Sequence, residues 1–521
     1  MKRRVWKKHH KWFGLILVFF MLMFCVSGIV LNHREAVSGV DVSRKWLPSA
    51  YRFDRWNHGL LRGSWRCVHT DSMLLYGSNG IWQTDSQASV FADFNEGLPA
   101  GTDHRNVRAV VQTADSSLFA LTPYALYRRC GAAWRAVGLP DRQDEWLSDL
   151  TQMGDTLIVT GRSHLYLSVY PYRVFEKRSL KASADADGKV SLFRTVWLLH
   201  SGELFGTPGK LLMDGVALLL SMLCVTGLLY WLLPHLIRRF SKQGQIRMAA
   251  TSLLKASLRW HDALGRYAFA LLMWVSFTGW CLRPPVLLAL VGSKVPPVPG
   301  TLLDDDNAWN DKLRLLRYDP TCADWLLSTS EGFYALSSLD AVPVKVAQAP
   351  PVSVMGLNVW QKDREGRWLA GSFSGMFVWN RANGKVHDYF TGNEVHEVTG
   401  SPFGQRAVSG CVSGWQSAPL VVEYVQGTAS LTMPESFSEL PMSLWNVALE
   451  VHTGRIYTIL GQGTLIFIFF AGLAAMWCIY SGFVIRKKTA SGSGEVTPKS
   501  WTVYLLSDLR KSSVFYRTLS I

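Results

Sequence analysis

A chain of 521 residues with 48% hydrophobic content is long enough for several structural units and is less apolar than a polytopic transporter. The formal net charge of +15 comes mostly from basic segments beside apolar runs, at residues 2–11, 238–259 and 486–488. This placement predicts a membrane topology and attraction to anionic membrane lipid, and it argues against nucleic acid as a partner.

Four apolar runs predict transmembrane helices, at residues 12–31, 211–233, 267–282 and 465–484. About 20 residues cross a hydrocarbon core of about 30 Å; the third run is shorter and gains length from the stretch before it. The first run is longer than a signal-peptide core and lacks a small-x-small site, so it is expected to be retained. The basic flanks place both termini in the cytoplasm and residues 33–205 and 285–452 outside.

The predicted fold class is therefore an α+β membrane protein, with four transmembrane helices as a duplicated helix pair and an all-β outer region. The expected segments are 1–35 (cytoplasmic N-terminus and first helix), 36–195 (first half of the outer β region), 196–240 (second helix), 241–285 (cytoplasmic loop and third helix), 286–445 (second half of the β region), 446–488 (fourth helix) and 489–521 (cytoplasmic tail).

The outer region contains short alternating runs that read as β-hairpins. The strong copies lie at residues 74–85, 118–129, 157–168, 326–337 and 369–380, with a weaker one near 407–413. Their starts are spaced by about 40 residues, a period typical of propeller blades. Three blades in each half predict one shared propeller of about six blades, because neither half could cover its own edge strands. Two separate compact β domains are the alternative.

The two halves of the chain repeat at an offset of about 251 residues. His10 with Gly14 falls on His261 with Gly265, and Ser27-Gly28 falls on Thr278-Gly279. The segment His200-Ser201-Gly202 returns as His452-Thr453-Gly454. A duplicated helix pair would present matching imidazoles to one central axis.

The repeat predicts that His10 faces His261 at the cytoplasmic side, and that His200 faces His452 at the outer side. Two neutral imidazoles facing each other in an apolar bundle are the ligand set of haem b, and with both axial positions filled the iron suits electron transfer. We therefore expect two haem b groups, whose iron these four histidines bind. The alternative is that each histidine extends its ring to the membrane interface.

Several neighbouring residues leave alternatives open. His33 could replace an outer ligand by pairing with His200, and His235 is a weaker inner candidate. Asp214 could hydrogen-bond His200, pair with Arg455 or be solvated among headgroups. The basic residues expected to neutralise haem propionates are Arg194, Lys210 and Arg455. The glycines Gly14, Gly265, Gly28 and Gly279 would admit a macrocycle or simply allow close helix packing.

The membrane segments resemble those of a known family. The stretch HKWFGLILVFFMLMFCVSGIVLNHRE resembles the opening helix of PepSY-associated transmembrane proteins, and LLHSGELFGTPGKLLMDGVALLLSMLCVTGLLYW resembles their second helix, of which VHTGRIYTILG is a diverged copy. The resemblance implies a four-helix, haem-b-carrying module of the bacterial inner membrane that moves electrons to ferric siderophores. It also implies ligands at His10, His200, His261 and His452. The outer region departs from the family, because it predicts blades rather than a PepSY domain.

The resulting expectation is an inner-membrane di-haem protein that reduces a ferric complex on behalf of iron uptake. No GxGxxG, flavin or P-loop motif is visible, so the expected electron donor is a quinol or a cytoplasmic reductase. The alternative is a non-enzymatic sensor or assembly factor, whose periplasmic propeller binds a ligand. A transporter is disfavoured, because four helices without a central broken helix offer little pathway.

Overall fold

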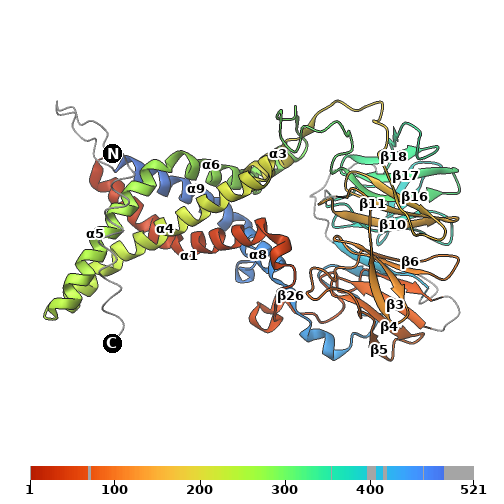
Figure 1. Ribbon diagram of the computed structural model, residues 1–521, viewed down its shortest axis with the longest axis horizontal. Helices are drawn as coiled ribbons and strands as arrows, with labels where there is room; N and C mark the ends of the chain where they lie inside the picture. Colours follow the sequence, from red (N-terminus) through yellow and green to blue (C-terminus); the bar gives the residue numbers. More distant parts are fainter. Residues whose placement is uncertain are drawn as a thin grey trace.

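The computed structural model describes residues 2–67, 72–142, 144–353, 355–395, 406–414, 419–461 and 463–485. Figure 1 shows a bundle of helices at one end of the long axis and a group of sheets at the other. The predicted tail, 489–521, and the basic residues 486–488 lie outside the described residues.

The bundle and its connections contain all the α-helices of the described part of the chain. They are α1 (Arg3–Asn32), α2 (Arg34–Val37), α3 (Leu192–Ser201), α4 (Gly206–Arg239), α5 (Gly244–Tyr267), α6 (Phe269–Cys281), α7 (Val286–Val291), α8 (Leu444–Thr453) and α9 (Gly463–Val484). Two of them start slightly earlier than the expected helical segments, because α3 and α8 begin at serine N-caps, Ser191 and Ser443.

Among the described residues, three helical segments are long and apolar enough to cross a membrane: Arg3–Asn32, Glu203–Arg239 and Gly463–Val484. The shorter α6 has 13 residues and follows α5 after the single residue Ala268. Backbone hydrogen bonds continue across this break, from the Ala268 N–H to the Leu264 carbonyl at 3.0 Å and from the Leu272 N–H to the Ala268 carbonyl at 2.9 Å. The two helices therefore form one bent rod, while a fourth membrane-spanning helix stays a prediction.

The rods pack in a ring. Helix α1 contacts α4 and α9, α4 contacts α5, and α6 contacts α9. The outward faces carry large exposed apolar side chains such as Ile16, Leu218 and Phe470. Inside, small side chains such as Ala471 and Ala475 pack against Leu17, which brings the helices close together.

The other end of the molecule consists of small sheets, so the chain is a mixed helix-and-sheet protein. Four of the described sheets are four-stranded antiparallel meanders: β6 (Ala109–Gln112), β7 (Leu118–Leu121), β8 (Leu126–Cys130) and β9 (Ala133–Val137); β10 (Leu147–Met153), β11 (Thr156–Gly161), β12 (Leu165–Val169) and β13 (Glu176–Arg178); β16 (Leu313–Asp319), β17 (Asp324–Thr329), β18 (Gly332–Leu336) and β19 (Val344–Lys345); β20 (Leu357–Lys362), β21 (Trp368–Ser372), β22 (Gly375–Asn380) and β23 (Lys385–Asp388).

One further sheet joins the two ends of the β region. It contains β2 (Gly63–Arg66), β3 (Ser72–Gly77), β4 (Gly80–Asp85), β5 (Phe91–Asp93), β24 (Val408–Val412) and β25 (Leu420–Glu423). The late strand β24 pairs in parallel with the early strand β2, with Gly63 opposite Cys411. The five strong hairpins predicted from the sequence are confirmed as β3–β4, β7–β8, β11–β12, β17–β18 and β21–β22.

Apolar clusters lie between the sheets that follow one another in the chain. Here the β24–β25 pair is counted separately from β2–β5. Among the described residues, each two sheets that are neighbours in this order share one apolar cluster. Members from the two sides are Leu74 and Tyr127, Phe119 and Val159, Leu165 and Leu327, Leu326 and Phe377, Leu369 and Val408, and Leu75 and Val422. The sheets are thus packed face to face in sequence order, while their closure into a propeller stays a prediction.

Two short ladders join the sheets to the bundle in equivalent ways. Strand β1 (Asp41–Val42), which follows α1, pairs with β26 (Met442–Ser443), which leads into α8. Strand β14 (Val190–Ser191) leads into α3 and pairs with β15 (Lys294–Val295). Each half of the chain therefore sends one short helix, α3 or α8, back towards the bundle beside a strand of the other half.

Candidate functional site

The short helices α3 and α8 are near copies that each carry one of the predicted outer ligands. Ser191 and Ser443 cap their N-termini through hydrogen bonds from the N–H groups of Arg194 and Asn446. Both helices end at glycines, Gly202 and Gly454, with φ of 78° and 77°, a left-handed conformation that favours glycine. The same caps at the same spacing place His200 and His452 in the last turn of each helix.

The outer histidines face each other. The ring centroids of His200 and His452 lie 6.1 Å apart at an interplanar angle of 49°. The Nδ1 of His200 lies 3.1 Å from the Val275 carbonyl oxygen, and that of His452 lies 3.0 Å from the Phe24 carbonyl oxygen. A carbonyl can only accept, so both rings carry a proton on Nδ1.

The inner histidines repeat this arrangement. The ring centroids of His10 and His261 lie 5.9 Å apart at 67°. Their Nδ1 atoms donate to the Cys478 carbonyl at 2.9 Å and to the Leu223 carbonyl at 3.1 Å. His10 and Phe24 belong to the same helix, fourteen residues apart, so the two sites are separated by about 21 Å along the bundle.

Each Nδ1 also contacts a hydroxyl three residues after the carbonyl that it meets. The hydroxyl oxygens lie 3.1 to 3.3 Å from Nδ1 and belong to Ser27, Thr226, Thr278 and Ser481. Every one of these hydroxyls donates its proton to a carbonyl of its own helix, for example Ser27 to Met23 at 2.6 Å. The oxygen is therefore left to accept from the imidazole, which reinforces the Nδ1–H tautomer.

A glycine follows each hydroxyl and makes room for the imidazole. A Cβ at Gly28 or Gly227 would lie 3.3 or 3.2 Å from the histidine Cε1, and one at Gly279 or Gly482 would lie 2.7 or 2.8 Å from it. Any side chain at the last two positions would force the ring to move. The expected close approach at Gly28 and Gly279 is thus an approach of the histidine ring itself.

The carbonyl, hydroxyl and glycine around each imidazole are called its cradle below. Sequence reasoning missed two of the four hydroxyl–glycine pairs, Thr226-Gly227 and Ser481-Gly482. The signal was available, because a hydroxyl residue followed by glycine occurs once in each apolar run, as CVSG, CVTG, SFTG and IYSG. Every cradle also crosses between the two halves of the chain. His10 is held by α9, His452 by α1, His200 by α6 and His261 by α4.

The outer pair is half-buried and neutral. Burial lowers the pKa of His200 to about 4, with a further contribution from the positive charge of Arg283. Burial likewise lowers the pKa of His452 to about 3, with contributions from His200 and Arg283. Both imidazoles are therefore unprotonated at Nε2 at physiological pH, which is the form that binds a metal.

The spacing of the rings fits a metal between them. Two metal–imidazole bonds of about 2 Å each, with about 1 Å more from each nitrogen to its ring centre, put the centroids about 6 Å apart. The measured 6.1 and 5.9 Å agree with this value. Both sites thus combine suitable spacing with Nδ1–H groups held by carbonyls, and at the outer site the Nε2 atoms are unprotonated.

His33 joins neither pair. Its Nε2 lies 2.6 Å from the Asp214 carboxylate, and its side chain is 42% exposed. Asp214 also accepts from the Asn32 amide at 3.2 Å, so the expected contacts from Asp214 to His200 or Arg455 are not the ones that form. The other inner candidate, His235, donates to the Trp231 carbonyl of its own helix at 2.9 Å.

The cations expected near propionates all have acidic partners. Arg194 contacts Asp311, Lys210 contacts Glu203 at 3.2 Å, and Arg455 contacts Glu450 at 2.6 Å. Sequence reasoning missed Arg283, whose Nη2 donates to the His452 carbonyl at 2.9 Å. Its position directly after α6 gave no signal, because only the tertiary structure brings it to α8.

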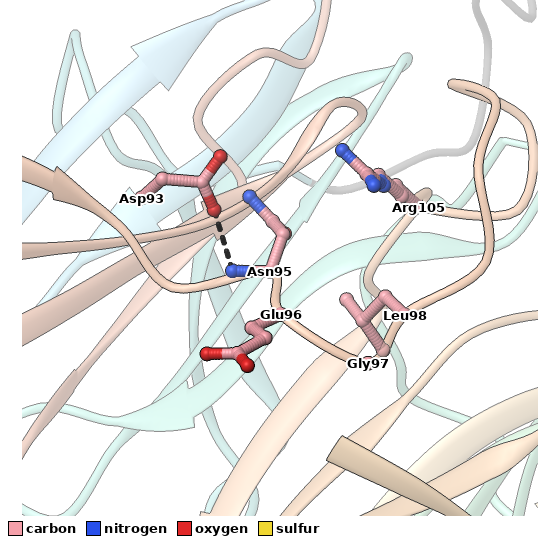
Figure 2. Close-up of a pocket in the computed structure, with 6 residues that line it drawn as sticks. All are labelled: Asp93, Asn95, Glu96, Gly97, Leu98 and Arg105. Carbon is pink, nitrogen blue, oxygen red and sulfur yellow. Dashed lines mark hydrogen bonds between the residues drawn. The ribbon is translucent and has the colours of Figure 1, made fainter. Parts of the chain in front are cut away.

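A recess on the β region is a separate feature (Figure 2). It is lined by Asp93, Asn95, Glu96, Gly97, Leu98 and Arg105. Asp93 accepts from the Asn95 N–H at 2.6 Å, and the Asn95 side chain bonds to both backbone groups of Ile81. These bonds fix the turn after β5, a strand labelled in Figure 1, and the recess adds nothing to the histidine sites.

Comparisons with known proteins agree with the membrane half of this description. Residues 1–233 match the family model described as the PepSY-associated TM region. No curated protein matches the chain in sequence. Two crystal structures of the extracellular domain of BT4673 from B. thetaiotaomicron, described as part of a one-component and of a hybrid two-component system, show 6% and 8% identity and TM-scores of 0.32 and 0.23. They cover 69% and 70% of this chain, which spans 40% and 38% of theirs.

Proposed function

We propose that this membrane protein, whose residues 1–233 match the model of the PepSY-associated TM region, is a di-haem b electron-transfer protein that reduces a ferric siderophore or a related ferric complex for iron uptake. The observation that carries the proposal is the presence of two facing imidazole pairs, with ring centroids 5.9 and 6.1 Å apart. Each of the four rings has its Nδ1 hydrogen-bonded to a carbonyl, which leaves Nε2 as the atom of each ring that would bind a metal.

The residues have distinct parts in this function. His10 with His261, and His200 with His452, would each hold one haem b, which would supply one-electron iron chemistry when bound. The carbonyls and hydroxyls around each ring would orient the imidazole and raise its basicity by accepting hydrogen bonds from Nδ1–H. Because each haem would be held by two histidines, the ferric complex would be reduced without binding to the haem iron.

The bundle is proposed to contain four spanning helices, with the bent rod α5–α6 as the fourth. From His261 to Cys281 this rod has a length of about 30 Å, which matches a hydrocarbon core. Its charged residues Asp262 and Arg266 pair with each other at 2.5 Å near its α5 end. This end lies beside α4, whose last turn carries Arg238 and Arg239.

The proposed location is the bacterial inner membrane, with both termini in the cytoplasm and the sheets in the periplasm. The support is the distribution of basic residues, since residues 2–11 and 238–259 lie at the same end of the bundle, away from the sheets (Figure 1). The positive-inside rule assigns this end to the cytoplasm. His10 and His261 then form the cytoplasmic site, and His200 and His452 the periplasmic site.

The sheets are proposed to close into one six-bladed propeller. Its support is the series of apolar clusters shared by neighbouring sheets, which returns to its start where β24 pairs with β2. The first strands of the neighbouring sheets also contact one another, β2 with β6, β6 with β10, β10 with β16 and β20 with β24. A ring of this kind hides the edge strands that either half would expose alone.

The proposed electron donor is a quinol or a cytoplasmic reductase, because the chain has no flavin or dinucleotide motif of its own. Electrons would pass from the cytoplasmic site to the periplasmic site and then to the ferric complex. The rival function is a non-enzymatic sensor or assembly factor, in which the sheets bind a ligand and the histidines hold no metal.

Absorption spectroscopy of the purified protein separates the two functions. Expressed with added haem precursor, the protein should show the Soret band and reduced α-band of low-spin, bis-imidazole haem b, at a ratio of two haems per chain. Addition of a ferric chelate to the dithionite-reduced, desalted protein should then reoxidise these bands. A colourless protein would reject the proposal in favour of the sensor function, and a coloured protein that no ferric chelate reoxidises would reject the reductase role.

A further inference from the structure

Three arginines lie at the N-terminal ends of strands β2, β6 and β16 of the β region. Arg62 and Arg108 directly precede β2 and β6, and Arg314 is the second residue of β16. In chain order, each of these strands is the first of its sheet. Contacts connect them in series, from β2 to β6, from β6 to β10 and from β10 to β16. Their starts therefore bring the three guanidinium groups, called the central arginines below, to one side of the sheet assembly.

The positive charge at this place exceeds the negative charge. Three further arginines surround the central ones: Arg34 pairs with Asp103 at 2.6 Å, and Arg162 and Arg194 share the single carboxylate of Asp311. Six guanidinium groups thus meet two carboxylates, an excess of four positive charges.

The central arginines themselves contact no carboxylate among the described residues. Arg62 donates to the Asn106 side chain and the Val107 carbonyl, both at 2.8 Å. Arg314 donates to the carbonyls of Asp311 and Leu313, also at 2.8 Å. The Arg108 side chain is exposed and makes no hydrogen bond or ion pair with the described residues, whereas its backbone N–H donates to the Leu121 carbonyl at 2.7 Å.

This unbalanced charge costs free energy. Desolvation lowers the pKa of Arg108 well below its usual value, and repulsion from Arg62, Arg34 and Arg162 lowers it further. Desolvation likewise lowers the pKa of Arg314 to about 8, with repulsion from Arg162 and Arg194. A guanidinium stays charged in proteins, so these shifts express an uncompensated charge that a bound anion would stabilise.

The cluster lies next to the outer histidine pair. Arg194 belongs to α3 and precedes His200 on the same helix by six residues, or about 9 Å. Its contact with Asp311 ties α3 to the segment that begins β16. An anion held by the central arginines would therefore sit between the sheets and the proposed periplasmic haem.

We infer that the central arginines form a binding site for an anionic ferric chelate, one whose iron is held by catecholate or carboxylate oxygens. That the anion carries iron rests on the proposed function, whereas the anion site itself rests on the excess of guanidinium groups. Guanidinium forks bind such oxygens in pairs, which makes the site selective for negative over neutral chelates. Arg108, the exposed member, is the group that meets the ligand, and Arg62 and Arg314 add to the attraction.

The test uses the full-length protein in nanodiscs and a redox-inert probe. Equilibrium dialysis measures binding of a gallium(III) tricatecholate, which is anionic, and of a neutral gallium(III) trihydroxamate. The wild type should bind the tricatecholate at least about tenfold more tightly, and Arg108→Gln should abolish this preference by weakening tricatecholate binding at least about tenfold. Arg108→Lys should keep part of it, and the control Arg135→Gln, an exposed arginine on the outer strand β9, should keep all of it.

Two results would overturn the inference. One is equal binding of both gallium chelates by the wild type. The other is a loss of haem from Arg108→Gln, measured as pyridine haemochromogen, with unchanged chelate binding, because the arginines would then serve the haem propionates. Gallium is not reduced, so a colourless protein that still prefers the tricatecholate would reject the proposed function and leave the anion site standing.

Discussion

In the helical bundle few side chains are buried, whereas the sheets enclose a series of large apolar clusters. The polar side chains of the two regions also have different partners. In the bundle, Ser27, Thr226, Thr278 and Ser481 each hold one imidazole. In the β region, buried carboxylates such as Asp149 and Asp319 tie one sheet to the next. The polar side chains of the bundle thus orient the facing histidines instead of joining helices to one another, and apolar burial contributes little to helix association in lipid.

The largest expected effect comes from removing a whole ligand pair. The double variant His200→Ala/His452→Ala should lose about half of the haem and nearly all ferric reduction, since the cytoplasmic site would remain but its electrons would lack the periplasmic relay. Pyridine haemochromogen per chain measures the loss. His33→Ala is the matched control, because this exposed histidine contacts Asp214 and not the pair. Equal haem loss in the control would return His33 to the ligand set.

A smaller and graded effect is expected at the cradle glycines. Gly279→Ala places a Cβ 2.7 Å from His200 Cε1, whereas Gly28→Ala places one 3.3 Å from His452 Cε1. The first should weaken haem binding at the periplasmic site by at least about tenfold, and the second by no more than about threefold. Haem transfer to apomyoglobin gives the relative affinities. Gly215→Ala is the control, because nothing lies within 4 Å of the added Cβ. A greater loss of haem affinity in Gly28→Ala than in Gly279→Ala would contradict the prediction.

The smallest effect on haem is expected from a change in the β region. Asp319 is buried and accepts from Lys362 at 2.6 Å, Trp368 at 3.0 Å and Arg381 at 3.2 Å, all from the next sheet. Asp319→Asn should lower the free energy of unfolding of the β region by about 3 kcal/mol and leave haem binding unchanged. Chemical denaturation followed by tryptophan fluorescence measures it. Asp340→Asn, which removes an exposed ion pair with Arg178, should change stability by less than about 0.5 kcal/mol.

The carboxylate of Asp319 also determines how the stability of the β region changes with pH. Burial raises the pKa of Asp319, but hydrogen bonds from Lys362, Trp368 and other donors lower it more, so the net shift is downward. A lowered pKa in the folded state stabilises the fold above the unfolded value of about 4 and loses this contribution as the pH falls below it. The stability difference between wild type and Asp319→Asn should therefore shrink in acid, and a difference that grows would contradict the assignment.

The sequence by itself determined the local elements and the identity of the facing histidines. Alternation of apolar residues located the β3–β4 and β21–β22 hairpins, because side chains alternate along a strand wherever it lies. The repeat paired His10 with His261 and His200 with His452, because duplicated helices occupy equivalent places around one axis. Both inferences needed only periodicity and symmetry.

Only the tertiary structure decided which groups surround those histidines. The carbonyl that holds His10 belongs to Cys478, 468 residues away, and the one that holds His452 belongs to Phe24. Likewise His33 meets Asp214, and β24 pairs with β2, contacts that the helix and sheet periods leave undetermined. A repeating pattern fixes the face on which a side chain lies, whereas its partner depends on how distant helices and strands pack against one another.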